Sequence, residues 1–152
     1  MPQATALCLL AFLCLPAGCG VRRAVGLAKT PALSLQVNVT ARANGNAPIA
    51  VDLVSTTDKK ILAELSKLSA KDWFDRRRQF QRDFPDKVSI ASWEWVPGQQ
   101  VEPIAISLAP KSRGAFVFAQ YLTPGDHRAM LDITGPALLT LGEDDFTVQA
   151  LR

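Results

Sequence analysis

Cysteine is missing from most of this chain. The sequence of 152 residues has three cysteines, Cys8, Cys14 and Cys19, so none follows position 19. Residues beyond Cys19 therefore cannot form a disulfide with one another, and they offer no thiol as a nucleophile or zinc ligand. Histidine is almost as scarce, because His127 is alone. The acidic run at 143–145 lacks the spacing of a calcium loop, so we expect no metal site.

A catalytic arrangement is equally hard to find. His127 stands next to Asp126, but adjacent residues on a strand point to opposite faces, which is a poor geometry for a hydrolytic triad. The sequence also has no glycine-rich phosphate-binding motif. We therefore predict that the protein is not an enzyme and that it uses no cofactor and no small-molecule substrate. A hydrolase that depends on His127 is the least favoured alternative.

Net charge is low and confined to one segment. The formal net charge is +3. The segment 58–87 holds nine Lys or Arg and six Asp or Glu, which accounts for the whole excess and leaves the rest of the chain neutral. A charge this small gives little attraction to a phosphate backbone. Nucleic acid is therefore not an expected partner.

A hydrophobic run long enough to cross a membrane is also missing near the N-terminus. The apolar run Ala4–Leu15 has twelve residues. As a helix it would reach only ~18 Å, against a hydrocarbon core of ~30 Å. Its length suits the apolar core of a signal peptide, and the small residues that follow it up to Gly18 suit a cleavage site. We predict that residues 1–18 are a signal peptide.

The residue after this cleavage site is Cys19, and the ending resembles the lipobox of bacterial lipoproteins. There the cysteine becomes the first residue and is acylated, and several acyl chains anchor a protein more stably than one. We predict lipidation of Cys19, with membrane lipid as a partner, and a tether over residues 19–32. Because Gly20 is not Asp, we expect delivery to the periplasmic face of the outer membrane. Pro16 stands where the lipobox usually has Leu, so an ordinary signal peptide with a free Cys19 is the alternative.

Strand signals begin beyond the tether. Apolar and polar residues alternate over 33–41 and again over 49–53, as in strands with one buried face. Between them lies the polar segment 42–48, in which Asn44-Gly45 suits positive φ. We expect the two strands to form a hairpin with a somewhat long loop, in which substitutions are structurally mild.

A helical insertion separates the second strand from the third. Apolar residues at helical spacing over 57–69 indicate a first helix. Ser69 and Asp72 have the spacing of a capping box for a second helix, which ends before Pro85. The insertion is therefore expected at about residues 57–84. Its second helix carries several arginines, which we interpret as a solvated face paired with neighbouring acids.

Short strand-like segments fill the rest of the chain. They are 88–96, 101–108, 115–122, 128–133, 137–141 and 146–151. A switch from even to odd apolar positions within the first of them predicts a β-bulge near Ala91–Ser92. The segment 115–119 is apolar on both faces, which predicts a central strand. Seven or eight short strands favour a mainly β fold, a two-sheet β-sandwich, for residues 33–152.

Aromatic residues are the expected core of this sandwich. Trp93 and Trp95 share one face of their strand, and the core has limited volume, so we expect one of the two to be inside. Phe116, Phe118 or both are expected beside it.

The order of these features resembles the outer-membrane lipoprotein family of type VI secretion systems, called TssJ. The likeness rests on the signal and Cys19, Ile49–Val54 after a Gly-containing loop and Pro48, Asp72-Trp73-Phe74 in the insertion, Trp93–Gly98, and Gly114–Gln120. It implies a transthyretin-like β-sandwich, and it fits a divergent paralogue.

The resemblance also implies a structural role. In that family the lipidated cysteine holds the domain to the outer membrane, and the loop between the first two strands binds the periplasmic end of the inner-membrane protein TssM. That loop corresponds to residues 42–47, so the candidate partner-binding residues are Arg42, Asn44, Gly45 and Asn46, and the candidate partner is a TssM-like protein. From the residues alone the loop is a polar turn. A periplasmic lipoprotein binding module of another envelope system remains the alternative.

Overall fold

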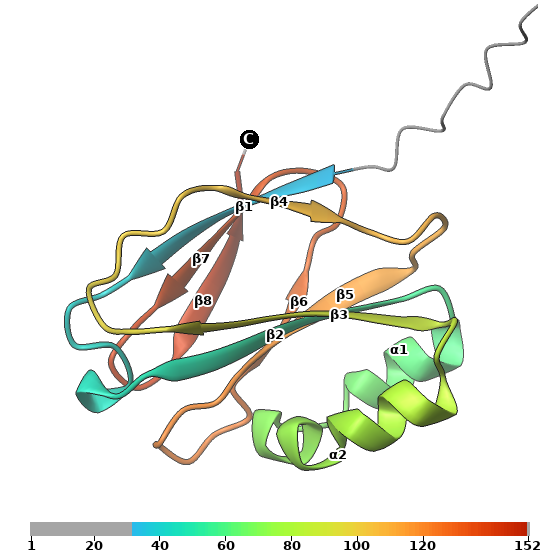
Figure 1. Ribbon diagram of the computed structural model, residues 1–152, viewed down its shortest axis with the longest axis horizontal. Coiled ribbons are helices and arrows are strands. Elements are labelled where there is room, and N and C mark those ends of the chain that lie inside the picture. The colour runs from blue at the N-terminus through green and yellow to red at the C-terminus, as the bar shows by residue number, and fades with distance from the viewer. Residues whose placement is uncertain (1–31, 152) are drawn as a thin grey trace, which may run out of the picture.

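The computed structural model describes residues 32–151, which contain eight strands, two α-helices and a short 3-10 segment (Figure 1). In chain order the elements are β1 (Ala32–Val39), η1 (Ala43–Asn46), β2 (Ile49–Thr56), α1 (Lys59–Leu65), α2 (Ala70–Asp83), β3 (Val88–Trp95), β4 (Ile104–Ser107), β5 (Gly114–Ala119), β6 (Arg128–Leu131), β7 (Ala137–Leu141) and β8 (Phe146–Ala150). The mainly β prediction is confirmed. The predictions for the signal peptide, for Cys19 and for the tether up to residue 31 lie outside the described residues.

The strands form two four-stranded sheets that pack face to face, as predicted. One sheet has the order β4-β1-β7-β8 and the other the order β3-β2-β5-β6. The expected hairpin of the first two strands is wrong, because β1 and β2 belong to different sheets. β1 pairs with β4 and β7, while β2 pairs with β3 and β5. Alternation identifies the face that a strand buries but not its neighbour, and both strands bury their apolar face in the same core.

The helical insertion covers the outer face of the β3-β2-β5-β6 sheet (Figure 1). Its predicted place between the second and third strands is confirmed. The capping box is present, since Ser69 Oγ accepts a hydrogen bond from the Asp72 backbone and Asp72 accepts one from the Ser69 backbone. Asp58 caps α1 by accepting bonds from two backbone N–H groups. None of the helices in the described segment is long and apolar enough to span a bilayer.

This arrangement gives the molecule two apolar cores, one between the sheets and one under the helices. The central position of β5 is confirmed, and all six of its residues are buried. Its small residues face the other sheet, whereas Phe116 and Phe118 pack under the helices with Trp73. The expectation that these phenylalanines lie between the sheets is therefore wrong, because their side chains are on the opposite face of β5. The helical layer therefore gives the outer face of β5 an apolar core of its own.

The β-bulge predicted near Ala91–Ser92 is absent from the described strand. β3 pairs with β2 in one unbroken register from Ile49↔Trp95 to Thr56↔Val88. The switch in buried positions arises because the two ends of β3 bury opposite faces. Trp95 is buried between the sheets with Trp93 partly buried beside it, and Ile90 packs against the helical core.

Candidate functional site

Three connections meet at one end of the sandwich and bond to one another. They are the η1 loop (residues 40–48), the Leu122 loop (residues 120–127) and the β7–β8 turn (residues 142–145), which together we call the loop end. β1 begins at Ala32, runs for eight residues and is followed by the η1 loop. Eight residues of strand span about 26 Å. The loop end therefore lies at the opposite end of the sandwich from the first described residue (Figure 1).

The η1 loop turns through residues with positive φ. Asn44, Gly45 and Asn46 have φ values of 48°, 59° and 68°, and asparagine and glycine tolerate this region better than other residues. The Ala47 backbone N–H donates to Asn44 O at 3.1 Å and closes the turn. The positive φ predicted for Asn44-Gly45 is confirmed, and the local sequence explains the shape of the loop.

The four residues predicted to bind a partner fall into two groups. Arg42, Gly45 and Asn46 are exposed, and the Arg42 guanidinium pairs with Glu143 of the β7–β8 turn. Asn44 is only 2% exposed. The structure therefore exposes three of these residues to solvent and turns the side chain of the fourth inward.

Asn44 joins the three connections of the loop end. Its Oδ1 accepts a hydrogen bond from the Leu122 backbone N–H at 2.7 Å, and its Nδ2 donates to Pro48 O at 3.0 Å. Its own backbone N–H donates to Gly142 O at 3.1 Å. Substitution of Asn44 is therefore not structurally mild, which corrects the expectation for this loop.

His127 is buried within the Leu122 loop. Its Nδ1 lies 2.9 Å from Asp145 Oδ1, and its Nε2 lies 2.8 Å from Thr123 O. Both ring nitrogens therefore lie within hydrogen-bond distance of an oxygen atom of the protein itself. The ring stacks on Tyr121 at 4.9 Å between centroids, and a side chain at Gly125 would lie 2.8 Å from it. His127 thus fastens its loop to the β7–β8 turn.

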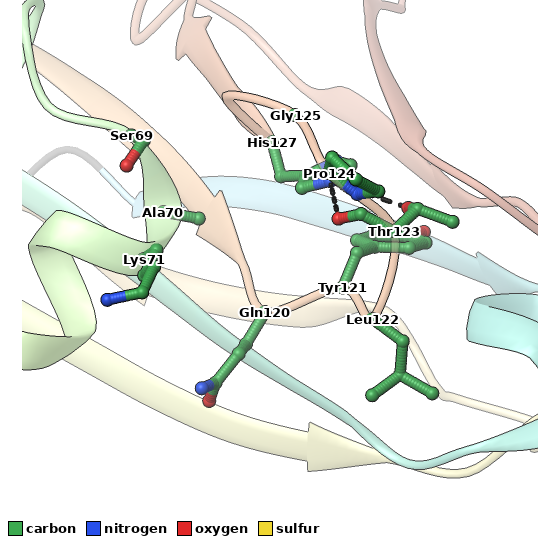
Figure 2. Close-up of a pocket in the computed structure, with 10 residues that line it drawn as sticks. All are labelled: Ser69, Ala70, Lys71, Gln120, Tyr121, Leu122, Thr123, Pro124, Gly125 and His127. Atoms are coloured by element: carbon green, nitrogen blue, oxygen red, sulfur yellow. Dashed lines mark hydrogen bonds between the residues drawn. The ribbon is translucent and has the colours of Figure 1, made fainter.

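Tyr121 completes this connection from below the imidazole ring (Figure 2). Its hydroxyl contacts the backbone oxygens of Gly142 and Asp145 at 3.3 and 3.0 Å. Burial raises the pKa of Tyr121 above its usual value, and the Asp145 charge acts in the same direction. The phenol therefore remains a neutral hydrogen-bond donor.

The contacts around His127 differ from those of a hydrolytic triad. Asp126 lies 3.4 Å from the Arg128 guanidinium and is not the partner of His127. The Thr123 hydroxyl donates to Asp144 O at 2.7 Å, so its proton is already in use. The two imidazole nitrogens face Asp145 Oδ1 and Thr123 O, which are contacts within the protein. Residues 32–151 contain no group of three or more His, Cys, Asp or Glu side chains placed to hold a metal ion.

Two hollows flank Leu122 at the surface. One, of about 430 Å³, lies between the Leu122 loop and the N-terminal residues of α2, Ser69 to Lys71 (Figure 2). The other, of about 270 Å³, lies between Leu122 and the η1 loop and is lined by Asn44, Pro48 and Glu94 among others. The Leu122 side chain points away from Pro124 and His127 (Figure 2).

A buried carboxylate beneath α2 was missed by the sequence reasoning. Asp52 on β2 is 1% exposed. It accepts a bond from Trp73 Nε1 at 2.8 Å, and Arg77 Nη1 lies 3.1 Å from the same oxygen. The contacts attach α2 to the sheet. The sequence did contain a signal for this ion pair: an acidic residue stands within an apolar strand, and the inserted helix carries arginines that could pair with it.

Comparison with solved structures identifies the fold. No protein-family model and no curated protein matches the sequence. The chain matches the T6SS lipoprotein TssJ1 from Pseudomonas aeruginosa with a TM-score of 0.62 and 18% identity, over 81% of this chain and 98% of that one. It has the TssJ fold.

Two further structures agree with this assignment. One is Serratia marcescens Lip, a membrane-bound component of the type VI secretion system, with a TM-score of 0.59, 15% identity, and coverage of 79% of this chain and 99% of that one. The other is a chain in a structure of the T6SS protein TssM C-terminal domain from EAEC, with a TM-score of 0.55, 15% identity, and coverage of 79% and 97%. At these identities the likeness to TssJ concerns the fold.

Proposed function

We infer that this protein is a lipid-anchored structural component of a type VI secretion membrane complex. The main support for this proposal is the TssJ fold, which matches over most of this chain and of the compared chains. The lipobox-like ending at Cys19 is a second, independent support. The three solved structures described above are named as lipoproteins or components of that secretion system.

Anchoring to the outer membrane is the first part of this function. Lipidation of Cys19 would attach the chain, and 13 peptide units separate it from Ala32. Such a segment reaches at most about 45 Å when fully extended. Because β1 then leads away to the loop end, the surface formed by the three connections would face the periplasm rather than the membrane.

Attachment to an inner-membrane partner is the second part. The partner is a TssM-like protein, and Arg42, Gly45 and Asn46 are the proposed contacts because they are exposed on the η1 loop. Asn44 supports this site without contacting the partner, because its side chain forms hydrogen bonds within the protein. A bridge between two membranes needs these two attachments at separate places, and the strand length provides the separation.

A double substitution in the η1 loop tests the partner role. Asn46→Gly removes the amide but keeps the positive φ, and Arg42→Ala breaks only an exposed ion pair. We expect the double variant to unfold at the wild-type temperature and to lose co-purification with the TssM-like protein. Arg78→Ala, on the exposed face of α2, is the matched control and should bind normally.

Two outcomes of this pull-down would contradict the proposal. Full binding by a stably folded double variant would remove the η1 loop from the site. Failure of the wild-type protein to retain a TssM-like partner would favour a binding module of another envelope system.

A further inference from the structure

The Leu122 loop offers a second contact surface beside the η1 loop. Leu122 is 76% exposed, more than the other large exposed hydrophobic residues, Met130 and Val96. A single exposed apolar residue is ordinary on a protein surface. Leu122 differs because its backbone is fixed by Asn44 and because a hollow lies on each side of its side chain.

The fixed backbone matters for binding energetics. The Leu122 N–H is bonded to Asn44 Oδ1, and its neighbours Tyr121 and Thr123 are bonded to the backbone of the β7–β8 turn. Ordering a flexible loop on binding costs free energy, and a loop held in place by its own protein avoids most of that cost. Leu122 is therefore presented in one position with little remaining freedom.

Charge identifies the chemistry of the occupant. Five exposed acids surround the loop end: Glu94, Asp126, Glu143, Asp144 and Asp145. The nearby cations Arg128 and Arg42 pair with Asp126 and Glu143, and Lys71, at the larger hollow, pairs with Asp75 of its own helix. Asp145 Oδ1 lies 2.9 Å from His127 Nδ1. Within the described part of the chain, Glu94 and Asp144 have no ion-pair partner.

The rest of the molecule strengthens this polarity. The excess positive charge lies in the segment 58–87, which forms the helical layer. A basic partner segment would therefore be attracted to the loop end and repelled from the helices. Such complementarity accelerates association and fixes orientation.

We propose that the partner surface extends from the η1 loop to Leu122 and takes a basic, partly apolar segment of the partner protein. An apolar side chain of that segment packs against Leu122 in the hollow shared with Pro48. Neighbouring Lys or Arg side chains pair with Glu94 and Asp144. This inference rests on the proposed function, because it names the segment chemistry that the TssM-like partner must supply.

Binding of the full-length chain in detergent to the periplasmic part of the TssM-like protein tests the inference. Leu122→Ser should weaken binding about tenfold or more, as expected for a central apolar anchor. Met130→Ser, at a residue that is 60% exposed on β6, is the apolar control and should bind like the wild type. All variants should show the wild-type unfolding temperature, since neither side chain is buried.

The charges are tested by reversal. Glu94→Lys combined with Asp144→Lys should weaken binding about three- to tenfold at low salt and flatten its salt dependence. Asp86→Lys combined with Asp132→Lys makes the same change in net charge and should bind normally. Both residues are exposed, and both adjoin the strand ends opposite to the loop end.

The outcomes separate this inference from the proposed function. The inference would be wrong, and the proposed function would stand, if binding is lost in the Arg42→Ala, Asn46→Gly variant but is unchanged in the other two. Those two are Leu122→Ser and the charge reversal at Glu94 and Asp144. Absence of wild-type binding would overturn both. A stronger complex after charge reversal would show that the segment is acidic and would also overturn it.

Discussion

At the residue scale, Asn44 shows how one side chain can organise a surface without belonging to the exposed part of it. Asn44→Ala would leave the Leu122 N–H and Pro48 O without partners and place alanine at a φ of 48°. Each unsatisfied group costs about 1–3 kcal/mol, and the strained backbone adds about 1 kcal/mol. We expect a loss of about 3 kcal/mol or more in the free energy of unfolding, measured in denaturant.

A second variant separates the two contributions to this loss. Asn44→Gly removes the same hydrogen bonds but accepts positive φ, so it should be less destabilising than Asn44→Ala by about 1 kcal/mol. Equal stability of both variants with the wild type would mean that Asn44 does not support the loop end.

The same residue marks what the sequence can predict at this scale. Asn44-Gly45 predicted positive φ because that preference is local to the two residues. The bond from Leu122, 78 residues away in sequence, has no local signal. Arg42, Gly45 and Asn46 could be placed on an exposed turn, whereas the burial of Asn44 depends on where two distant loops meet.

At the element scale, the N-terminal ends of both helices depend on ionised aspartates. A hydrogen bond from Lys87 lowers the pKa of Asp58 below 3.8, and a bond from Ser69 does the same for Asp72. A carboxyl with a lowered folded-state pKa stabilises the fold above its unfolded pKa and loses this contribution as pH falls through the folded value. We expect the helical layer to weaken between about pH 5 and pH 2, measured by circular dichroism during thermal unfolding.

Asparagine provides the matched control for these caps. Asp58→Asn with Asp72→Asn keeps an acceptor oxygen at each helix start but removes the titration. The double variant should therefore lose less stability than the wild type over the same acid range. An identical acid response in both proteins would show that these caps do not carry the pH dependence.

Elements were predictable where their signals are local. The capping box at Ser69 and Asp72 identified the start of α2, because both partners lie within one helical turn. Strand partners were not predictable, since β1 pairs in parallel with β7 about 100 residues later. The incorrect prediction of a bulge in β3 has a related cause. This sheet is covered by a second sheet on one face and by helices on the other, so a strand can bury its even-numbered or its odd-numbered residues.

At the scale of the whole molecule, the fold places its two proposed attachments at opposite ends. Ala32 begins β1 at one end, and the η1 loop, the Leu122 loop and the β7–β8 turn form the other. Between them the two cores of the sandwich and the helical layer form one packed body. A packed body of this kind can transmit force from an anchor to a partner, which suits the proposed bridging component.

Cys19→Ser tests the anchoring end by itself. The substitution removes the only thiol that would remain after cleavage, so lipid labelling should disappear and the protein should move from the membrane fraction to the soluble periplasm. Acyl chains supply the membrane affinity in this proposal, because each buried methylene contributes about 0.8 kcal/mol. The folded domain lies beyond the tether, so its unfolding temperature should not change. Membrane fractionation that persists in Cys19→Ser would mean that another contact holds the protein there. A soluble, folded Cys19→Ser protein that still binds the TssM-like partner would show that anchoring and partner binding are independent, as their separation along β1 requires.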